Sequence, residues 1–150
     1  MNHTISIFRD RADRFSTILA GVNSRWDAPT PCTDWTAEDI VRHVIATERD
    51  FLARHDLGSP DATADLEPAQ AWDQHRRSTL DILSRDGVAD RAFDGHFGPT
   101  TIGDTLANFY GWDLAVHGWD IARATGQDGS ITADEADNLA VLVPEILAAM

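Results

Sequence analysis

The sequence predicts an all-α fold, in its simplest form a four-helix bundle with an additional C-terminal helix. Three observations support this prediction. Apolar residues recur at spacings of three and four, capping residues and glycines stand at the segment ends, and strand signals are nearly absent. This spacing places apolar side chains on one face of a helix, so that several helices can bury their faces around one core.

Length and composition limit the class of protein. The chain has 150 residues, of which 43% are hydrophobic and 25% charged, so we expect a single domain over residues 1–150. Its apolar runs are too short for a membrane span, and its N-terminus lacks the apolar region of a signal peptide. The single cysteine, Cys32, excludes an internal disulfide and fits a reducing compartment. These features predict a cytoplasmic protein.

The net charge of −13 argues against two kinds of partner. Nucleic acids are bound largely through Lys and Arg side chains that release counterions from phosphates. Anionic membrane surfaces attract basic segments in a similar way. We therefore expect neither a nucleic acid nor a membrane as a partner.

The first helix is predicted from about His3 to Gly21. Its apolar stripe consists of Ile5, Phe8, Ala12, Phe15, Leu19 and Val22. The segment from Trp26 to Trp35 contains two prolines within three residues, Pro29 and Pro31, and is therefore predicted to be an ordered loop.

The second and third helices are marked by their ends. Thr36 is predicted to cap the second helix, because it is followed by acidic residues in the first turn. The inner face of this helix comprises Ile40, His43, Val44, Thr47 and Phe51. The third helix is predicted from about Glu67 to Asp86, and Gly87 ends it. Its stripe is Trp72, His75, Thr79 and Leu83.

The last two helices follow a short non-helical piece. Residues 93–99 are predicted as a loop or a short extended segment. Thr100 or Thr101 is expected to cap the fourth helix, and Gly126 to end it. Thr132 begins a capping-box pattern for a fifth helix, in which Pro144 should produce a kink.

The fourth helix contains the most informative pair of residues, Asp113 and His117. They fall on the apolar stripe of Leu106, Tyr110 and Ile121, so an acid and an imidazole are expected to point inward. Residues four apart on a helix lie on one face and can share one metal ion. His43, on the inner face of the second helix, is the best third ligand, and three ligands leave an open position. A structural role for either histidine, or a salt bridge of Asp113, is the alternative.

Other polar residues are weaker candidates. His75, His96 and Arg123 are predicted as substrate contacts, although a packing role for His75 and a solvated loop position for His96 are alternatives. Asp120 is interpreted first as an ion-pair partner of Arg123 and second as a residue that orients His117. For Cys32, a packing role in its loop is favoured over a nucleophilic one.

Taken together, these motifs resemble a known family. Trp26-x-x-Pro-Thr-Pro-Cys-x-x-Trp35 is followed by a helix with His43 and then by Asp113-x-x-x-His117-Gly-Trp-Asp-Ile-Ala-Arg-Ala-Thr-Gly126. In this order, the motifs resemble the N-terminal domain of mycothiol-dependent maleylpyruvate isomerases, within the DinB-like superfamily of metal-binding helical bundles. The resemblance implies a DinB-like bundle whose divalent ion is bound by His43, Asp113 and His117. The isomerases carry Glu at the position of Asp113, and the chain resembles their short, single-domain, metal-binding relatives.

The resemblance also implies a function. The metal, zinc first and nickel, manganese or iron as alternatives, would activate mycothiol or a similar low-molecular-weight thiol. The reaction would be S-transfer to an electrophile or a thiol-assisted isomerisation, with the thiol and the electrophile as small-molecule partners. Exposed tryptophans favour a homodimer. A non-enzymatic, structural or sensing bundle is the alternative, and metal-assisted hydrolysis without a thiol ranks last because no general base stands out.

Overall fold

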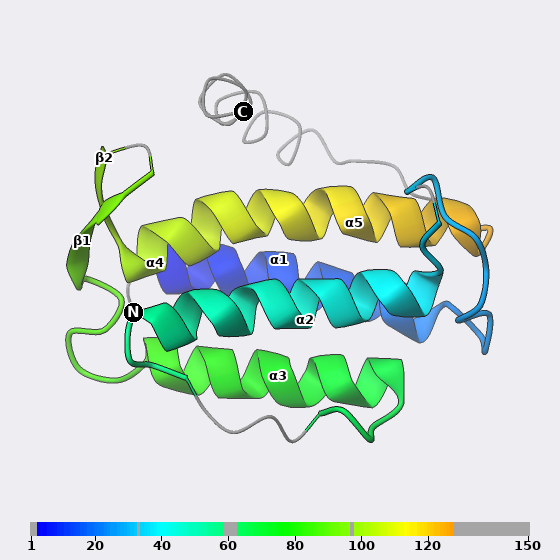
Figure 1. Ribbon diagram of the computed structural model, residues 1–150, viewed down its shortest axis with the longest axis horizontal. Helices are drawn as coiled ribbons and strands as arrows, with labels where there is room; N and C mark the ends of the chain where they lie inside the picture. The colour runs from blue at the N-terminus through cyan, green and yellow to red at the C-terminus, as the bar shows by residue number, and fades with distance from the viewer. Residues whose placement is uncertain (1–2, 33, 59–62, 97, 128–150) are drawn as a thin grey trace.

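The helices of the chain lie side by side in a computed structural model that describes residues 3–32, 34–58, 63–96 and 98–127 (Figure 1). The first three are α1 (His3–Ala20), α2 (Ala37–Arg54) and α3 (Pro68–Leu83). The fourth consists of α4 (Ile102–Asp104), the π-helical segment η1 (Thr105–Tyr110) and α5 (Gly111–Ala124), which follow one another without a break. The predicted all-α bundle is therefore confirmed.

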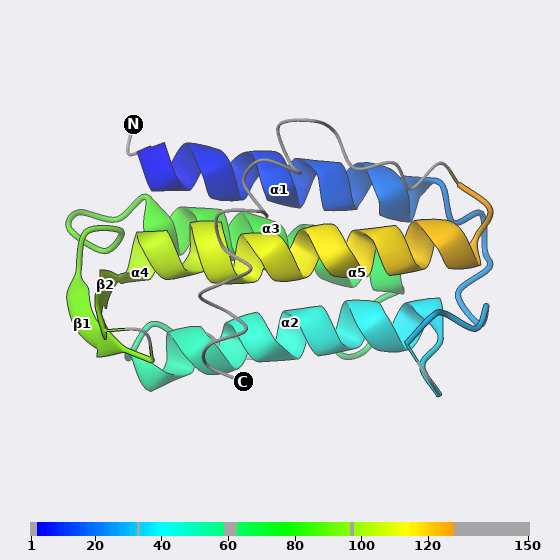
Figure 2. The ribbon, with the colours of Figure 1, turned by 90° about the horizontal axis from the view of Figure 1, so that it is seen from above.

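Each helix of the bundle packs against two neighbours. α5 and α3 each contact both α1 and α2, so α1 and α2 occupy opposite corners. In Figure 1 α2 lies in front and α1 behind, with α5 above and α3 below, and Figure 2 shows α5 between α1 and α2 from above. A loop must therefore cross the end of the bundle to join α1 to α2, and this loop contains Cys32.

The core is formed by the stripes that the sequence predicts. All six stripe residues predicted for the first helix are buried, including Val22 just beyond the end of α1, and so are Trp72, His75, Thr79 and Leu83 of α3. The largest fully buried side chains include Trp72, Phe8, Phe15, Ile40, Leu83, Ile102, Leu106, Leu114 and Ile121. Burial of such side chains contributes roughly 1.5–3 kcal/mol each, which stabilises the bundle.

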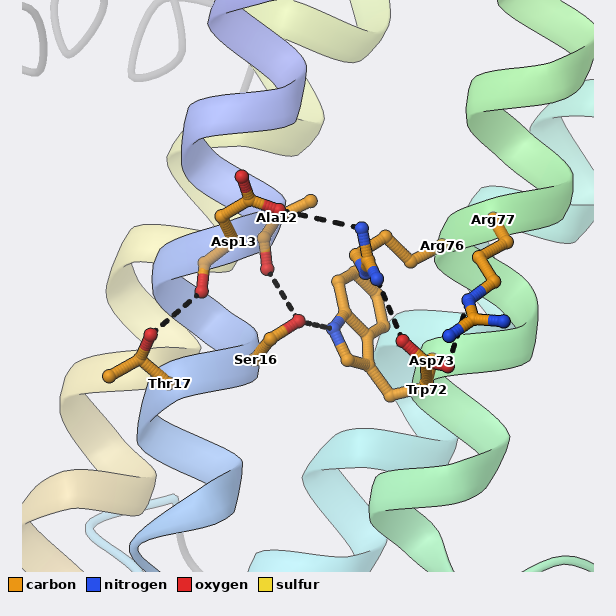
Figure 3. A network of polar contacts seen from close by, with 8 residues as sticks. All are labelled: Ala12, Asp13, Ser16, Thr17, Trp72, Asp73, Arg76 and Arg77. Carbon is orange, nitrogen blue, oxygen red and sulfur yellow. Dashed lines mark hydrogen bonds and ion pairs between the residues drawn. The ribbon is translucent and has the colours of Figure 1, made fainter.

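Polar contacts fix α1 against α3 (Figure 3). The indole Nε1 of Trp72 donates to Oγ of Ser16 at 2.9 Å, and the ring packs edge-on against Phe15 with centroids 4.8 Å apart. The Arg76 guanidinium lies 2.7 Å from Asp73 on its own helix and 3.4 Å from Asp13 on α1. The buried indole nitrogen therefore has its hydrogen-bond partner, as a buried donor needs.

The predicted helix caps at Thr36, Thr101 and Gly126 are confirmed, whereas α3 ends at Leu83, before the predicted Asp86. Thr36 caps α2 in a capping box with Asp39, in which each side chain accepts a hydrogen bond from the other residue's backbone N–H. The Oγ1 atom of Thr101 accepts from the backbone N–H of Asp104 at 3.1 Å and so caps α4. Gly126, just beyond α5, has a φ of 75°, a conformation that glycine adopts without strain.

Two local features go beyond the helices of the prediction. β1 (Ala92–Gly95) and β2 (Gly98–Thr101) pair as antiparallel strands, with Ala92 opposite Thr101, which agrees with the short extended segment that the sequence offers as one alternative for residues 93–99. The π-helical segment η1 has no counterpart among the predicted elements. The predicted fifth helix after Thr132, with its kink at Pro144, lies outside the described residues.

The π-helical segment changes which residues of α5 face the core. A π-helix takes more residues per turn than an α-helix, so the inward stripe is displaced along the sequence after Tyr110. Beyond that point the buried positions include Leu114 and Gly118, while Asp113 and His117 are only partly buried. The expectation that the pair points into the core is therefore corrected, because the pair lies at the edge of the core. None of the helices in the described ranges has the length and apolarity that crossing a membrane requires.

Candidate metal centre

Asp113 and His117 stand one turn apart on α5 and contact each other directly. Nε2 of His117 lies 3.2 Å from Oδ1 of Asp113. The His117 side chain is 13% exposed and that of Asp113 21% exposed, so both reach solvent on one side. The spacing of four residues accounts for this contact, since such side chains are neighbours on a helix surface. A pair that is partly exposed is accessible to an ion and to a small molecule.

The helix next to α5 brings His43 to the same place. The ring of His43, on α2, packs edge-on against the ring of His117, with centroids 5.7 Å apart. The indole of Trp35 lies 4.6 Å from His43 and 6.4 Å from His117, measured between ring centroids. The three residues predicted as metal ligands therefore cluster, although they come from two different helices.

A second group of polar side chains surrounds the other nitrogen of His117. The thiol of Cys32 donates to Oδ2 of Asp120 at 3.1 Å, and the same oxygen lies 3.5 Å from Nδ1 of His117. Ligand atoms of Cys32, Asp120 and His117 all lie within 4.8 Å of one another, which makes these three residues a possible metal-binding group. Two carboxylates and a thiol therefore surround one imidazole ring.

The sequence indicates this second group only in part, because it offers Asp120 as a residue that orients His117 but links Cys32 to neither residue. The sequence favours a packing role for Cys32 and pairs Asp120 first with Arg123. The structure instead pairs Asp120 with Cys32, which lies 88 residues away, so sequence proximity gives no signal for the contact. Arg123 is exposed, and its guanidinium carbon lies 5.4 Å from the centroid of the Trp119 ring.

The carboxylates around His117 and Cys32 shift the pKa values of both residues. Burial lowers the pKa of His117, but the hydrogen bond and charge of Asp113, together with the charge of Asp120, outweigh it and raise that pKa above its ordinary value. Burial, the hydrogen bond to Asp120 and the charges of Asp120 and Asp113 raise the pKa of Cys32 to about 11. The site thus favours positive charge on the ring and disfavours a thiolate.

The residues present fit a divalent cation. Imidazole nitrogens and carboxylate oxygens are the usual ligands of zinc, and the negative surroundings favour a cation. Nδ1 of His117 is buried and has no hydrogen-bond partner among the described residues, which is unusual for a polar atom in a folded chain. An arrangement in which one ring nitrogen binds an ion and the other donates a proton would satisfy both nitrogens.

The remaining predicted site residues lie in different surroundings. His75 is 4% exposed, and its Nε2 lies 3.0 Å from Oε1 of Glu48 and 3.4 Å from Oγ1 of Thr79. His96 is exposed at the tip of the hairpin. Glu48 is completely buried, which its position in the sequence, away from the face of His43, does not indicate. The roles of His75, His96 and Arg123 as substrate contacts stay predictions.

Comparisons with known proteins agree with this architecture. Residues 8–122 match the family described as mycothiol maleylpyruvate isomerase N-terminal domain. Two relatives from Mycobacterium tuberculosis, the uncharacterized proteins MT0763 of strain CDC 1551 / Oshkosh and Rv0738 of strain ATCC 25618 / H37Rv, are each 27% identical over 130 residues, which is 83% of this chain and 68% of theirs. No solved structure matches significantly. With its DinB-like helical bundle and matching sequence, the chain belongs to the mycothiol maleylpyruvate isomerase N-terminal domain family.

Proposed function

We propose that this protein binds a divalent metal ion, zinc in the first place, and uses it with mycothiol or a similar small thiol to modify an electrophile. His43, Asp113 and His117 are the proposed ligands. The observation that carries the proposal is the meeting of these three side chains from α2 and α5, with Asp113 and His117 in contact at 3.2 Å and partly open to solvent. The family to which the chain belongs supports the thiol.

The residues of the site have distinct roles in this proposal. Nε2 of His117, a ring nitrogen of His43 and the Asp113 carboxylate bind the ion, and three protein ligands leave room for an exogenous one. When bound, the ion lowers the pKa of a coordinated thiol, so that the thiol ionises at neutral pH. Trp35 packs against His43 and shields one side of the site from water.

The thiol that reacts is proposed to be the small molecule and not Cys32. With a pKa of about 11, Cys32 is almost entirely protonated at neutral pH, and the protonated form is a poor nucleophile. The small thiol would lose its proton to solvent, and its sulfur would form a bond to an electrophilic carbon. In S-transfer, the bond from that carbon to a leaving group breaks and the leaving group departs with the electron pair. In isomerisation, the sulfur adds to one carbon of a double bond, rotation follows, and the C–S bond breaks again to restore the double bond and release the thiol. Arg123 and His96, which are exposed, are the proposed contacts for the electrophile. His75 is buried and would act only through Glu48.

Metal analysis and a thiol assay test this function. Protein purified without added metal is analysed by mass spectrometry, beside His43→Ala, His117→Ala and the matched control His96→Ala. We expect stoichiometric metal in the parent and in His96→Ala, and a loss of metal in the other two. Loss of a small thiol in the presence of a generic electrophile is then followed for mycothiol and other thiols. A parent that holds no stoichiometric metal even after reconstitution contradicts the proposal.

A further inference from the structure

The two ring nitrogens of His117 lie in different surroundings. Nε2 contacts Oδ1 of Asp113 at 3.2 Å, and the ring of His43 packs edge-on against the same imidazole with centroids 5.7 Å apart. Nδ1 is buried and lies 3.5 Å from Oδ2 of Asp120, without forming a hydrogen bond in this geometry. The same Oδ2 accepts a hydrogen bond from the Cys32 thiol. One carboxylate oxygen thus stands between a thiol donor and an imidazole nitrogen.

We infer that Asp120, held in place by Cys32, is the positioning residue that accepts the Nδ1 proton of His117 and so directs Nε2 toward the metal. This inference rests on the proposed function. A neutral imidazole binds a metal through one nitrogen only and carries its proton on the other. An acceptor at the protonated nitrogen fixes both the tautomer and the orientation of the ring. Asp120 is the carboxylate available at Nδ1, and it is 5% exposed, so its charge is little screened by water.

The loop between α1 and α2 explains why Cys32 can hold Asp120. Thr30 fixes this loop, since its Oγ1 donates to the backbone carbonyl of Trp35 at 2.8 Å and accepts from the backbone N–H of Cys32 at 3.2 Å. The N–H of Trp35 donates in turn to the carbonyl of Cys32 at 3.1 Å. The thiol is therefore presented to Asp120 by a hydrogen-bonded turn, and the ring of Trp35 from the same turn packs on His43.

A competing arrangement uses the same atoms differently. Cys32, Asp120 and His117 could themselves bind an ion, since the sulfur, one carboxylate oxygen and one ring nitrogen lie within 4.8 Å of one another. In that case the thiol would lose its proton and Cys32 would be a ligand. The observed geometry favours positioning, because the Cys32 thiol donates a hydrogen bond to Asp120 and because Asp113 lies at Nε2 of His117, while His43 packs against the same ring.

Zinc affinity separates these arrangements. It is measured on the full chain by competition with a chromophoric chelator. The proteins compared are the parent, Asp120→Asn, Cys32→Ser, Cys32→Val and a charge-matched control, Asp86→Asn. Asp86 is exposed, so its substitution removes one negative charge away from the buried carboxylate of Asp120. We expect Asp120→Asn to bind zinc about 10–100-fold more weakly, as loss of such a supporting carboxylate does. Cys32→Val should lose more affinity than Cys32→Ser, because a hydroxyl still donates to Asp120. Asp86→Asn should bind like the parent.

A cobalt spectrum provides the second readout. Cobalt(II) bound by a thiolate gives an intense near-ultraviolet charge-transfer band, and we expect none in the parent protein. The inference is overturned if Asp120→Asn, with an unchanged circular dichroism spectrum, binds zinc as tightly as the parent. It is equally overturned if the band is present and disappears in Cys32→Ser, which would make Cys32 a ligand. A parent that binds no zinc overturns the proposed function and this inference together, whereas the first two results leave the proposed function standing.

Discussion

The thiol of Cys32 donates a hydrogen bond to the buried carboxylate of Asp120, and this contact bears on whether the cysteine can act as a nucleophile. Burial has the largest effect on this thiol and, together with Asp120, raises the pKa of Cys32 to about 11, so the thiolate is rare at neutral pH. A reactive cysteine instead needs positive surroundings that lower its pKa. In this site Cys32 serves as a hydrogen-bond donor for Asp120, and under the proposed function the reactive sulfur is that of the small thiol.

Glu48 is the second residue whose surroundings change its chemistry. It is completely buried on α2, its Oε1 lies 3.0 Å from His75, and its Oε2 has no hydrogen-bond partner within the described part of the chain. Burial raises the pKa of Glu48 above its ordinary value, although the hydrogen bond and charge of His75 act in the opposite direction. The ionised form therefore costs free energy in the folded protein.

The raised pKa of Glu48 determines the direction in which the stability of the fold changes with pH. Between its unfolded pKa and its higher folded pKa, the folded chain binds more protons than the unfolded chain, so stability falls as pH rises through this window. We predict that Glu48→Gln removes this fall and is more stable than the parent at neutral pH. The gain in the free energy of unfolding should be on the order of 1 kcal/mol for each tenfold by which the Glu48 carboxylate binds its proton more tightly in the folded chain than in the unfolded chain. Denaturant unfolding at a series of pH values measures it. A difference between parent and variant that does not change with pH would contradict the assignment.

At the scale of elements, the sequence predicts what local periodicity and capping chemistry determine. α1, α2 and α3 begin within a few residues of the predicted positions, because apolar stripes and the cap at Thr36 act locally. The fourth helix ends just before Gly126, whereas α3 ends at Leu83, before the predicted Asp86. The hairpin was indicated only as one alternative, a short extended segment, because its four-residue strands contain glycine and proline and are too short to show alternation. The π-helical segment escapes prediction because it alters the number of residues per turn without a signal in composition.

The candidate site was likewise predictable only where local spacing along the helices determines it. Asp113 and His117 share a helix face, so their proximity follows from their spacing, and an inward stripe indicated His43. The contact between Cys32 and Asp120 joins a loop to a helix 88 residues later, and only the packing of the bundle creates it. The part of Cys32 beside His117 therefore required the three-dimensional structure, whereas the spacing of Asp120, three residues after His117, indicated that these two could lie together.

One prediction concerns the start of α2. The side chain of Thr36 accepts from the backbone N–H of Asp39 at 3.2 Å, and Asp39 accepts from the N–H of Thr36 at 2.9 Å. Thr36→Ala leaves a helix N–H without its acceptor, which we expect to cost about 1 kcal/mol, while Thr36→Ser should keep most of the stability. Chemical denaturation of the three proteins provides the measurement. Equal stability of Thr36→Ala and the parent would show that the cap contributes nothing.

At the scale of the whole molecule, the bundle order determines which helices can share an ion. α2 and α5 are neighbours, and the loop from α1 to α2 reaches the same end of the bundle as His117 through Cys32. An ion bound by His43, Asp113 and His117 would therefore link two helices that are separated in sequence by α3 and the hairpin. A link of this kind is present only in the folded chain, so metal binding should stabilise the fold.

Thermal unfolding with and without zinc tests this linkage. At a free zinc concentration about 100-fold above the dissociation constant, binding adds about 2.7 kcal/mol, which for a chain of this length raises the Tm by roughly 5–10 °C. We expect this rise in the parent and in Thr36→Ala, whose own Tm is lower but whose ligands are intact. His43→Ala and His117→Ala should unfold cooperatively without zinc and show little of the rise. If His43→Ala instead fails to fold even without metal, His43 is primarily structural, and the bundle is better explained as a non-enzymatic module; if it folds and loses both the rise and thiol turnover, the site belongs to a metal-dependent enzyme.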